Sequence, residues 1–200
     1  MASRRASARA PRYLRTLIEL IYETHSTTVD NEEGRATGWL PGVLSEAGRE
    51  QARALGERRR DDGVDAVFTS DLARAVATAE IAFADSDLPL FKDWRLRECN
   101  YGELNGRPVA EIDSVKSRSV ENPYPGGESY RQVVQRIASL LDDLVAGFDG
   151  ARIVLVGHAA PRWALENLLA GRPLEELVVE PFDWQPGWLY RLDRERQPQG

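Results

Sequence analysis

Residues 153–156, Ile-Val-Leu-Val, form a continuous apolar run that leads into Gly157-His158, and Pro161 follows shortly after. A strand without polar positions is typical of a parallel sheet in which helices cover both faces. Proline is suited to the first turn of a helix, where its missing N–H costs nothing. The run therefore predicts a fully buried strand with a helix directly after it, which favours an α/β fold.

The rest of the chain alternates strand and helix patterns in the same way. Strands are expected at about 16–23, 65–69, 88–92 and 187–192, and helices at about 45–60, 71–83, 128–147 and after Pro161. This order predicts a single domain at residues 16–192, built as a three-layer sandwich with a mostly parallel central sheet and helices on both faces. Residues 1–15 and 193–200 are expected to be disordered tails.

Charge and composition argue against several functions. The net charge of -6 disfavours general binding to nucleic acid or to a membrane surface. No apolar run approaches the roughly 20 residues that span a bilayer. Cys99 is the single cysteine, so the chain forms no internal disulfide, which fits a reducing compartment. We therefore expect a cytoplasmic protein, and the sequence leaves open whether it forms a homodimer.

Both histidines of the chain follow expected strands, His25 after residues 16–23 and His158 after residues 153–156. In an open parallel sheet, ligands bind beyond the carboxyl ends of the strands, so His25, Ser70 and His158 are expected at one edge. The spacing of the two histidines does not predict a zinc site, and the chain has no Gly-x-x-x-x-Gly-Lys-Ser/Thr loop. Neither a metal nor a cofactor is predicted.

These residue types suit phosphoryl transfer. A neutral imidazole attacks phosphorus, a second group protonates the leaving alkoxide, and cations and neutral donors surround the anionic phosphoryl group. The chain offers candidates for each role: His25 as nucleophile, His158 as a second positive or hydrogen-bonding imidazole, Glu98 as acid, Arg74 as cation, and Asn31 and Ser70 as neutral donors.

An ordered set of motifs spans most of the chain. It consists of His25-Ser-Thr-Thr-Val-Asp-Asn31, Gly38-Trp39 through Leu44-Ser45, Gly48-Arg-Glu-Gln-Ala52, Ser70-Asp-Leu-Ala-Arg74-Ala-Val-Ala-Thr78-Ala79, Leu96-Arg-Glu98 with Gly102 and Gly106, and Pro125-Gly-Gly-Glu-Ser129. Together these motifs resemble the histidine phosphatase (phosphoglycerate mutase-like) superfamily, in its compact phosphatase branch. The resemblance implies that His25 is the phosphorylated nucleophile, that Glu98 is the proton donor, and that His158, Arg74 and Asn31 lie in the phosphate pocket.

One position departs from that family, which usually has an arginine directly before the nucleophile, whereas this chain has Thr24. By the resemblance that arginine faces the phosphate, so Arg35, Arg97 or Arg162 is expected to supply the charge instead. The resemblance implies a phosphomonoester hydrolase that acts on a small phosphorylated substrate through a phosphohistidine. Two alternatives stay open: an inactive phospholigand-binding or scaffold protein of the same fold, and a phosphoglycerate-type mutase.

Overall fold

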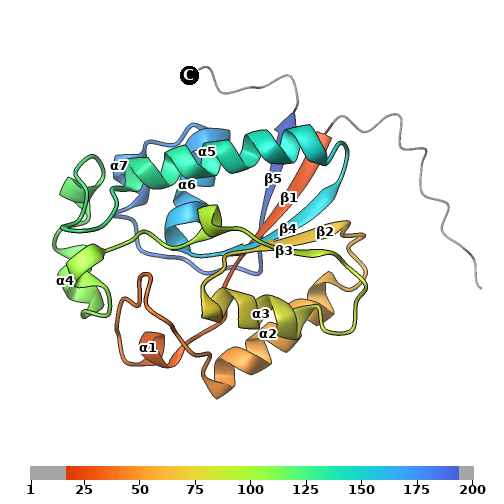
Figure 1. The fold of residues 1–200 in the computed structure, drawn as a ribbon, viewed down its shortest axis with the longest axis horizontal. Helices are drawn as coiled ribbons and strands as arrows, with labels where there is room; N and C mark the ends of the chain where they lie inside the picture. Colours follow the sequence, from red (N-terminus) through yellow and green to blue (C-terminus); the bar gives the residue numbers. More distant parts are fainter. Residues whose placement is uncertain (1–16, 194–200) are drawn as a thin grey trace, which may run out of the picture.

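The computed structural model describes residues 17–193, which form a five-stranded sheet between two layers of helices (Figure 1). The strands are β1 (Leu17–Thr24), β2 (Ala66–Thr69), β3 (Leu90–Lys92), β4 (Arg152–Gly157) and β5 (Trp188–Asp193), in the order β3-β2-β4-β1-β5. All neighbouring pairs are parallel except β1 with β5. The predicted α/β sandwich with a mostly parallel sheet is confirmed.

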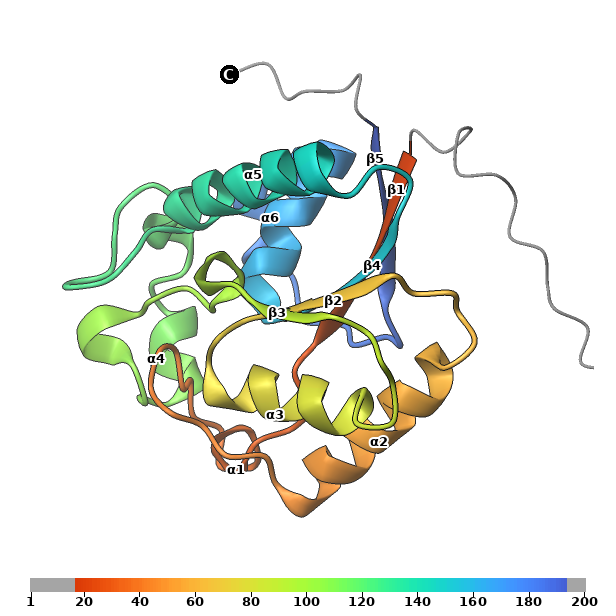
Figure 2. The same cartoon turned by 45° about the vertical axis from the view of Figure 1, so that its right-hand side comes forward.

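Two pairs of helices cover the two faces of this sheet (Figures 1 and 2). They are α2 (Glu46–Arg59) with α3 (Ala73–Ala82) on one face, and α5 (Tyr130–Gly147) with α6 (Ala159–Ala170) on the other. The short helices α1 (Val29–Glu32), α4 (Val109–Asp113) and α7 (Leu174–Leu177) lie in the connections. They were not predicted, because one helical turn is too short to show a hydrophobic period.

The domain was predicted at residues 16–192, and the structure describes residues 17–193. The tails expected at residues 1–15 and 193–200 lie outside the described residues, apart from Asp193, which is the last residue of β5. Among residues 17–193, no helix is both long enough and apolar enough to cross a membrane.

The strands are buried as their sequences require. The apolar run that predicted a two-sided strand lies in β4, where Ile153, Val154, Leu155 and Val156 are all inaccessible to solvent. Because successive side chains of a strand point to opposite faces, Ile153 and Leu155 pack in the core beneath α5 and α6, and Val154 and Val156 pack toward α3. The central strand is therefore held by both helical layers.

Local capping sets the start of α5. Ser129 accepts a hydrogen bond from the N–H of Gln132, whose side chain accepts one from the N–H of Ser129, so the two form a capping box. The helix consequently begins two residues after the predicted start at Glu128. Its predicted apolar stripe, which includes Val133 and Ile137, is buried.

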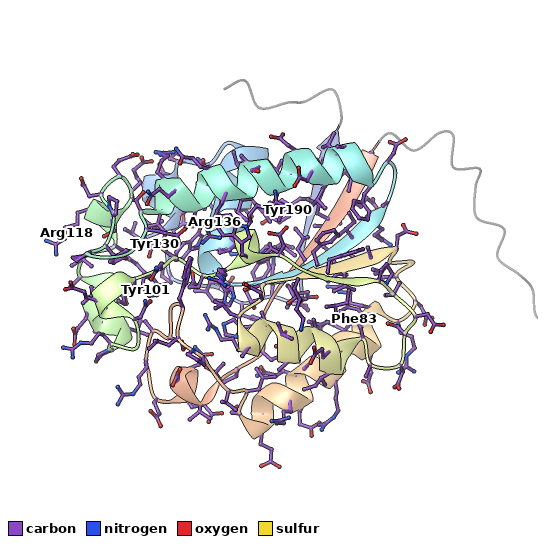
Figure 3. All side chains as sticks on the ribbon, viewed as in Figure 1. Phe83, Tyr101, Arg118, Tyr130, Arg136 and Tyr190 are labelled. Carbon is purple, nitrogen blue, oxygen red and sulfur yellow. The ribbon has the colours of Figure 1, made fainter. Side chains whose placement is uncertain are left out.

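A row of aromatic side chains connects α5 and α6 to the irregular segment at 96–106. Edge-to-face contacts run from Tyr101 through Tyr124 and Tyr130 to Trp163, with ring centroids 5.2, 6.1 and 5.5 Å apart. Tyr101 and Tyr130 are labelled in Figure 3. Such contacts contribute stability beyond the buried area, so this segment is packed against the core on the side that carries Glu98.

Candidate active site

The parallel topology brings three strand ends to one edge of the sheet. His25 follows β1, Ser70 follows β2 and His158 follows β4, and these three strands are adjacent in the sheet. The imidazole rings of His25 and His158 lie with centroids 4.9 Å apart. The structure thus places the three residues together at the edge where the sequence predicts a site.

Arg74, from the first turn of α3, lies against both imidazoles. Its Nε is 3.2 Å from Nε2 of His25, and one terminal nitrogen is 3.2 Å from Nδ1 of His158. A guanidinium only donates hydrogen bonds, so both of these ring nitrogens accept. The remaining nitrogens then carry the protons: Nδ1 of His25 donates to the carbonyl of Ser26 at 2.8 Å, and Nε2 of His158 donates to the hydroxyl of Ser70 at 3.0 Å.

These contacts make both imidazoles neutral. Burial, followed by the nearby charge of Arg74, lowers the pKa of His25 from 6.5 to about 3. The same two causes, in the same order, lower the pKa of His158 well below its ordinary value. Of the two roles considered for His158, the structure favours a hydrogen-bonding imidazole over a positive one. Nε2 of His25 is therefore the unprotonated nitrogen of the ring, and an imidazole nitrogen in this state can act as a nucleophile.

The backbone of His158 is held by the hydroxyl of Tyr22 in β1. That hydroxyl donates to the carbonyl of His158 at 2.6 Å and accepts from its N–H at 2.7 Å. Gly157 leaves the space for this contact, because a Cβ atom there would lie 2.2 Å from the hydroxyl oxygen. Burial, aided by the charge of Glu98, raises the pKa of Tyr22 well above its ordinary value, so the hydroxyl stays protonated.

The carboxylate of Glu98 sits at the N-terminus of α6. Its two oxygens accept hydrogen bonds from the N–H groups of Cys99, Ala160 and Ala159 at 2.8, 3.1 and 3.3 Å. The first N–H groups of a helix have no partner within the helix, so a carboxylate is well suited to this position. These bonds hold Glu98 beside His158, the residue that precedes the helix.

The backbone of Glu98 is also fixed. Its carbonyl accepts from the indole nitrogen of Trp39 at 2.7 Å and from Arg136 of α5 at 3.0 Å. Arg136, labelled in Figure 3, is 6% exposed and is paired with Glu128. Helices α5 and α6 and the segment that carries Trp39 therefore converge on Glu98.

These groups open onto a cavity of about 450 Å³, within the range of small-molecule sites. Its lining comprises Glu23, Thr24, His25, Ser26, Thr27, Asn31, Gln51, Leu55, Arg58, Glu98, His158, Ala159, Phe182 and Trp184. All three predicted catalytic residues are included. Within residues 17–193, no group of three or more His, Cys, Asp or Glu side chains is arranged to hold a metal ion.

The predicted phosphate-binding donors divide between the cavity and the layer behind it. Asn31 lines the cavity, and its side-chain oxygen also accepts from the N–H of Thr28 to cap α1. Ser70 and Arg74 are 0% and 2% exposed and lie behind the two imidazoles. Arg74 additionally donates to the carbonyl of Gly38 at 2.8 Å.

The three arginines expected to replace the missing one do not line the cavity. Arg35 is exposed and pairs with Glu33, and Arg97 pairs with Asp71 at 2.6 Å. Arg162 lies 3.7 Å from a carboxylate oxygen of Glu166, and its guanidinium stacks on Phe182 and Trp188. The expectation that one of them faces the anion has no support in this geometry.

Sequence reasoning missed several residues that build the site. Tyr22 and Arg136 lie in the middle of apolar patterns, where a tyrosine or an arginine stem reads as core packing. Thr78, whose hydroxyl accepts from the N–H of Ser26 at 3.0 Å, sits one turn after Arg74 on α3. The sequence did point to Thr78, which belongs to the motif that begins at Ser70 and shares a helix face with Arg74, four residues earlier. No such signal pointed to Arg58.

Comparison with known proteins assigns the family. The profile of the histidine phosphatase superfamily (branch 1) matches residues 24–198. A phosphoglycerate mutase of Candida albicans is 32% identical over 173 residues, covering 77% of this chain and 70% of that protein. The structure of a mycobacterial glucosyl-3-phosphoglycerate phosphatase complexed with VO3 is 30% identical, covers 82% of this chain and 85% of that one, and superposes with a TM-score of 0.71.

A second solved structure, Bacillus stearothermophilus YhfR, is 27% identical and superposes with a TM-score of 0.77 over 87% of this chain and 90% of that one. The relationship that the ordered motifs indicated is therefore confirmed, and the chain belongs to the histidine phosphatase superfamily.

Proposed function

We propose that this protein is a phosphomonoester hydrolase that acts through a phosphohistidine at His25. The observation that carries the proposal is the state of this imidazole. Its Nδ1 proton is committed to the carbonyl of Ser26, its pKa is lowered to about 3, and its Nε2 lone pair is beside the cationic guanidinium of Arg74. A neutral nucleophile next to a buried cation suits attack on an anionic phosphoryl group.

In the first step, Nε2 of His25 forms a bond to phosphorus while the bond to the ester oxygen breaks. Glu98 in its acid form gives a proton to the departing oxygen, which leaves as an alcohol. The Nε–H of Arg74 contacts Nε2 of His25. Once that nitrogen bonds to phosphorus it no longer accepts this hydrogen bond, and the N–H can donate to a phosphoryl oxygen instead. In the second step, the Glu98 carboxylate takes a proton from water, the water oxygen bonds to phosphorus, and the bond to His25 breaks.

The related proteins support phosphoester chemistry but do not single out one reaction. They include a mycobacterial glucosyl-3-phosphoglycerate phosphatase and an Escherichia coli α-ribazole-5′-P phosphatase described as putative, as well as phosphoglycerate mutases. The mutase alternative rests on the last group. The alternative of a binding protein without activity rests on Thr24, where the family usually has an arginine.

The test is turnover of p-nitrophenyl phosphate and of a panel of small phosphoesters by the purified full chain. We expect release of inorganic phosphate that His25→Ala abolishes, and rapid quenching should trap an acid-labile, base-stable phosphoryl label on His25. Folded protein that binds phosphate but hydrolyses nothing in the panel would favour the inactive alternative. Phosphoglycerate interconversion that requires a bisphosphate primer would favour the mutase.

We propose a small phosphorylated metabolite as the substrate, since the cavity of about 450 Å³ has the volume of a small-molecule site. The proposed steps use only side chains of this protein. We also propose a cytoplasmic location, in keeping with the lone buried Cys99. A homodimer remains a proposal that sedimentation can test.

A further inference from the structure

The cavity at the two histidines contains a single arginine. Among the described residues that line it, Arg58, near the end of α2, is the only arginine or lysine, whereas Glu23 and Glu98 are two acidic residues. The imidazoles are neutral, and Arg74 is covered by them. A phosphate dianion that enters the cavity therefore meets one cationic side chain on its wall, the half-buried Arg58.

Few contacts hold the guanidinium of Arg58. A terminal nitrogen lies 3.5 Å from one carboxylate oxygen of Glu23, and its buried Nε has no hydrogen-bond partner among the described residues. The side chain is 31% exposed. A buried donor without a partner costs free energy, so a ligand that accepts from this guanidinium would be favoured.

Glu23 does not need Arg58 to remain paired. The neighbouring Arg59 donates to the other carboxylate oxygen from two nitrogens, at 2.9 and 2.6 Å. Arg59 is further fixed by Asp62 at 2.8 Å and by the carbonyl of Pro186 at 2.8 Å. Of the two arginines, Arg59 is the closer partner of Glu23, and Glu23 stays paired if Arg58 turns toward a ligand.

Arg58 lies close to the strand end at which the family usually has its arginine. Glu23 precedes Thr24 and lies two residues before His25 along β1, a span of about 7 Å between α-carbons in an extended strand. Both Glu23 and Thr24 line the cavity with Arg58. The long, flexible arginine side chain can cover such a span by changing rotamer.

We propose that Arg58 binds the oxygens of the phosphoryl group held at His25 and so supplies, from α2, the cationic contact that Thr24 cannot make. This inference rests on the proposed function, since it assigns the phosphoryl group to the same cavity. It differs from the sequence expectation, which looked to Arg35, Arg97 and Arg162. A charge that comes from helix α2, instead of the strand end, completes the pocket.

The direct test is the affinity for inorganic phosphate, followed by ³¹P NMR titration, which needs no turnover. Arg58→Gln should weaken binding about 10- to 100-fold, the range expected for one charge-assisted contact, and Arg58→Lys should weaken it less. Arg53→Gln is the matched control, because Arg53 is exposed on the same helix and pairs with Glu50. Unchanged phosphate affinity in Arg58→Gln would overturn the proposal.

A substitution at Thr24, the last residue of β1, tests the role of Arg58 independently. Thr24→Arg alone should leave phosphate affinity within about twofold, because Arg58 already provides the charge, whereas the double change Thr24→Arg with Arg58→Gln should restore binding that Arg58→Gln loses. If Thr24→Arg alone strengthens phosphate binding tenfold or more, the wild-type pocket lacks the charge and Arg58 does not supply it. This readout stands even if Arg58→Gln folds poorly.

Two substrates distinguish whether Arg58 contacts the phosphoryl group or a charge in the leaving group. The leaving group of phenyl phosphate is uncharged, whereas the leaving group of 4-carboxyphenyl phosphate carries a carboxylate. Arg58→Gln should reduce kcat/KM for both substrates equally. A loss confined to 4-carboxyphenyl phosphate, with phosphate binding intact, would assign Arg58 to the leaving group and overturn the proposal. If no phosphoester is hydrolysed but phosphate binding depends on Arg58, the proposed function fails and the assignment of Arg58 stands.

Discussion

Tyr22→Phe removes the two hydrogen bonds that hold the backbone of His158, at 2.6 and 2.7 Å. The carbonyl of His158 keeps a longer bond, 3.4 Å, from the N–H of Arg162, but the His158 N–H has no other partner among the described residues. An orphaned buried donor costs roughly 1–3 kcal/mol, and losing the bond to the carbonyl costs roughly 0.5–1.5 kcal/mol more. We expect unfolding free energy to fall by about 3 kcal/mol.

The measurement is urea and thermal unfolding beside phosphatase activity. For a domain of this size, about 3 kcal/mol corresponds to a lower Tm by about 6–12 °C. Activity should fall about 10- to 100-fold, because Tyr22 positions the loop that carries His158 and misplacement of a reacting group is costly. Tyr22 is a positioning residue, so the loss should appear in kcat more than in KM.

Tyr130→Phe is the control for losing a buried hydroxyl. Tyr130 is 1% exposed, and its hydroxyl contacts that of Tyr124 at 3.2 Å, away from the histidines. It should cost about 1 kcal/mol and leave kcat unchanged. The reasoning is wrong if Tyr22→Phe destabilises no more than Tyr130→Phe and retains wild-type kcat.

Two further outcomes follow from the site. The pKa of His25 is lowered to about 3 in the folded state, so below pH 6.5 the unfolded state binds a proton that the folded state does not. The unfolding free energy should therefore have its full value above pH 6.5 and fall by about 1.4 kcal/mol per pH unit between pH 6 and 5. His25→Gln should remove that part of the slope in urea titrations, and an identical slope would refute it. Gly102→Ala should lower unfolding free energy by about 2–4 kcal/mol, since Gly102 has φ +56° and a Cβ there would lie 2.0 Å from the carbonyl oxygen of Pro125. Gly147→Ala, with open space at its Cβ, should cost nothing in the same unfolding assay, and equal losses would refute the packing argument.

The core of the fold was predictable because its signals are local. The apolar run of β4 needed helices on both faces, and the apolar side chains at helical spacing along α5 placed its start within two residues of the observed one. The edge of the sheet that carries His25 and His158 followed from the same patterns, because parallel strands present their carboxyl ends together. Short elements such as α1 and α4 escaped, since one turn shows no period.

The amino-acid sequence by itself determined the α/β class, the two histidines at strand ends and the absence of an arginine at Thr24. Only the tertiary structure decided which side chains complete the site. Tyr22 meets His158 across 136 residues because β1 and β4 are neighbours in the sheet. Arg58 reaches the cavity because the path of α2 places it beside Glu23. Such contacts depend on strand order, helix placement and side-chain reach, which leave no periodic trace in the chain.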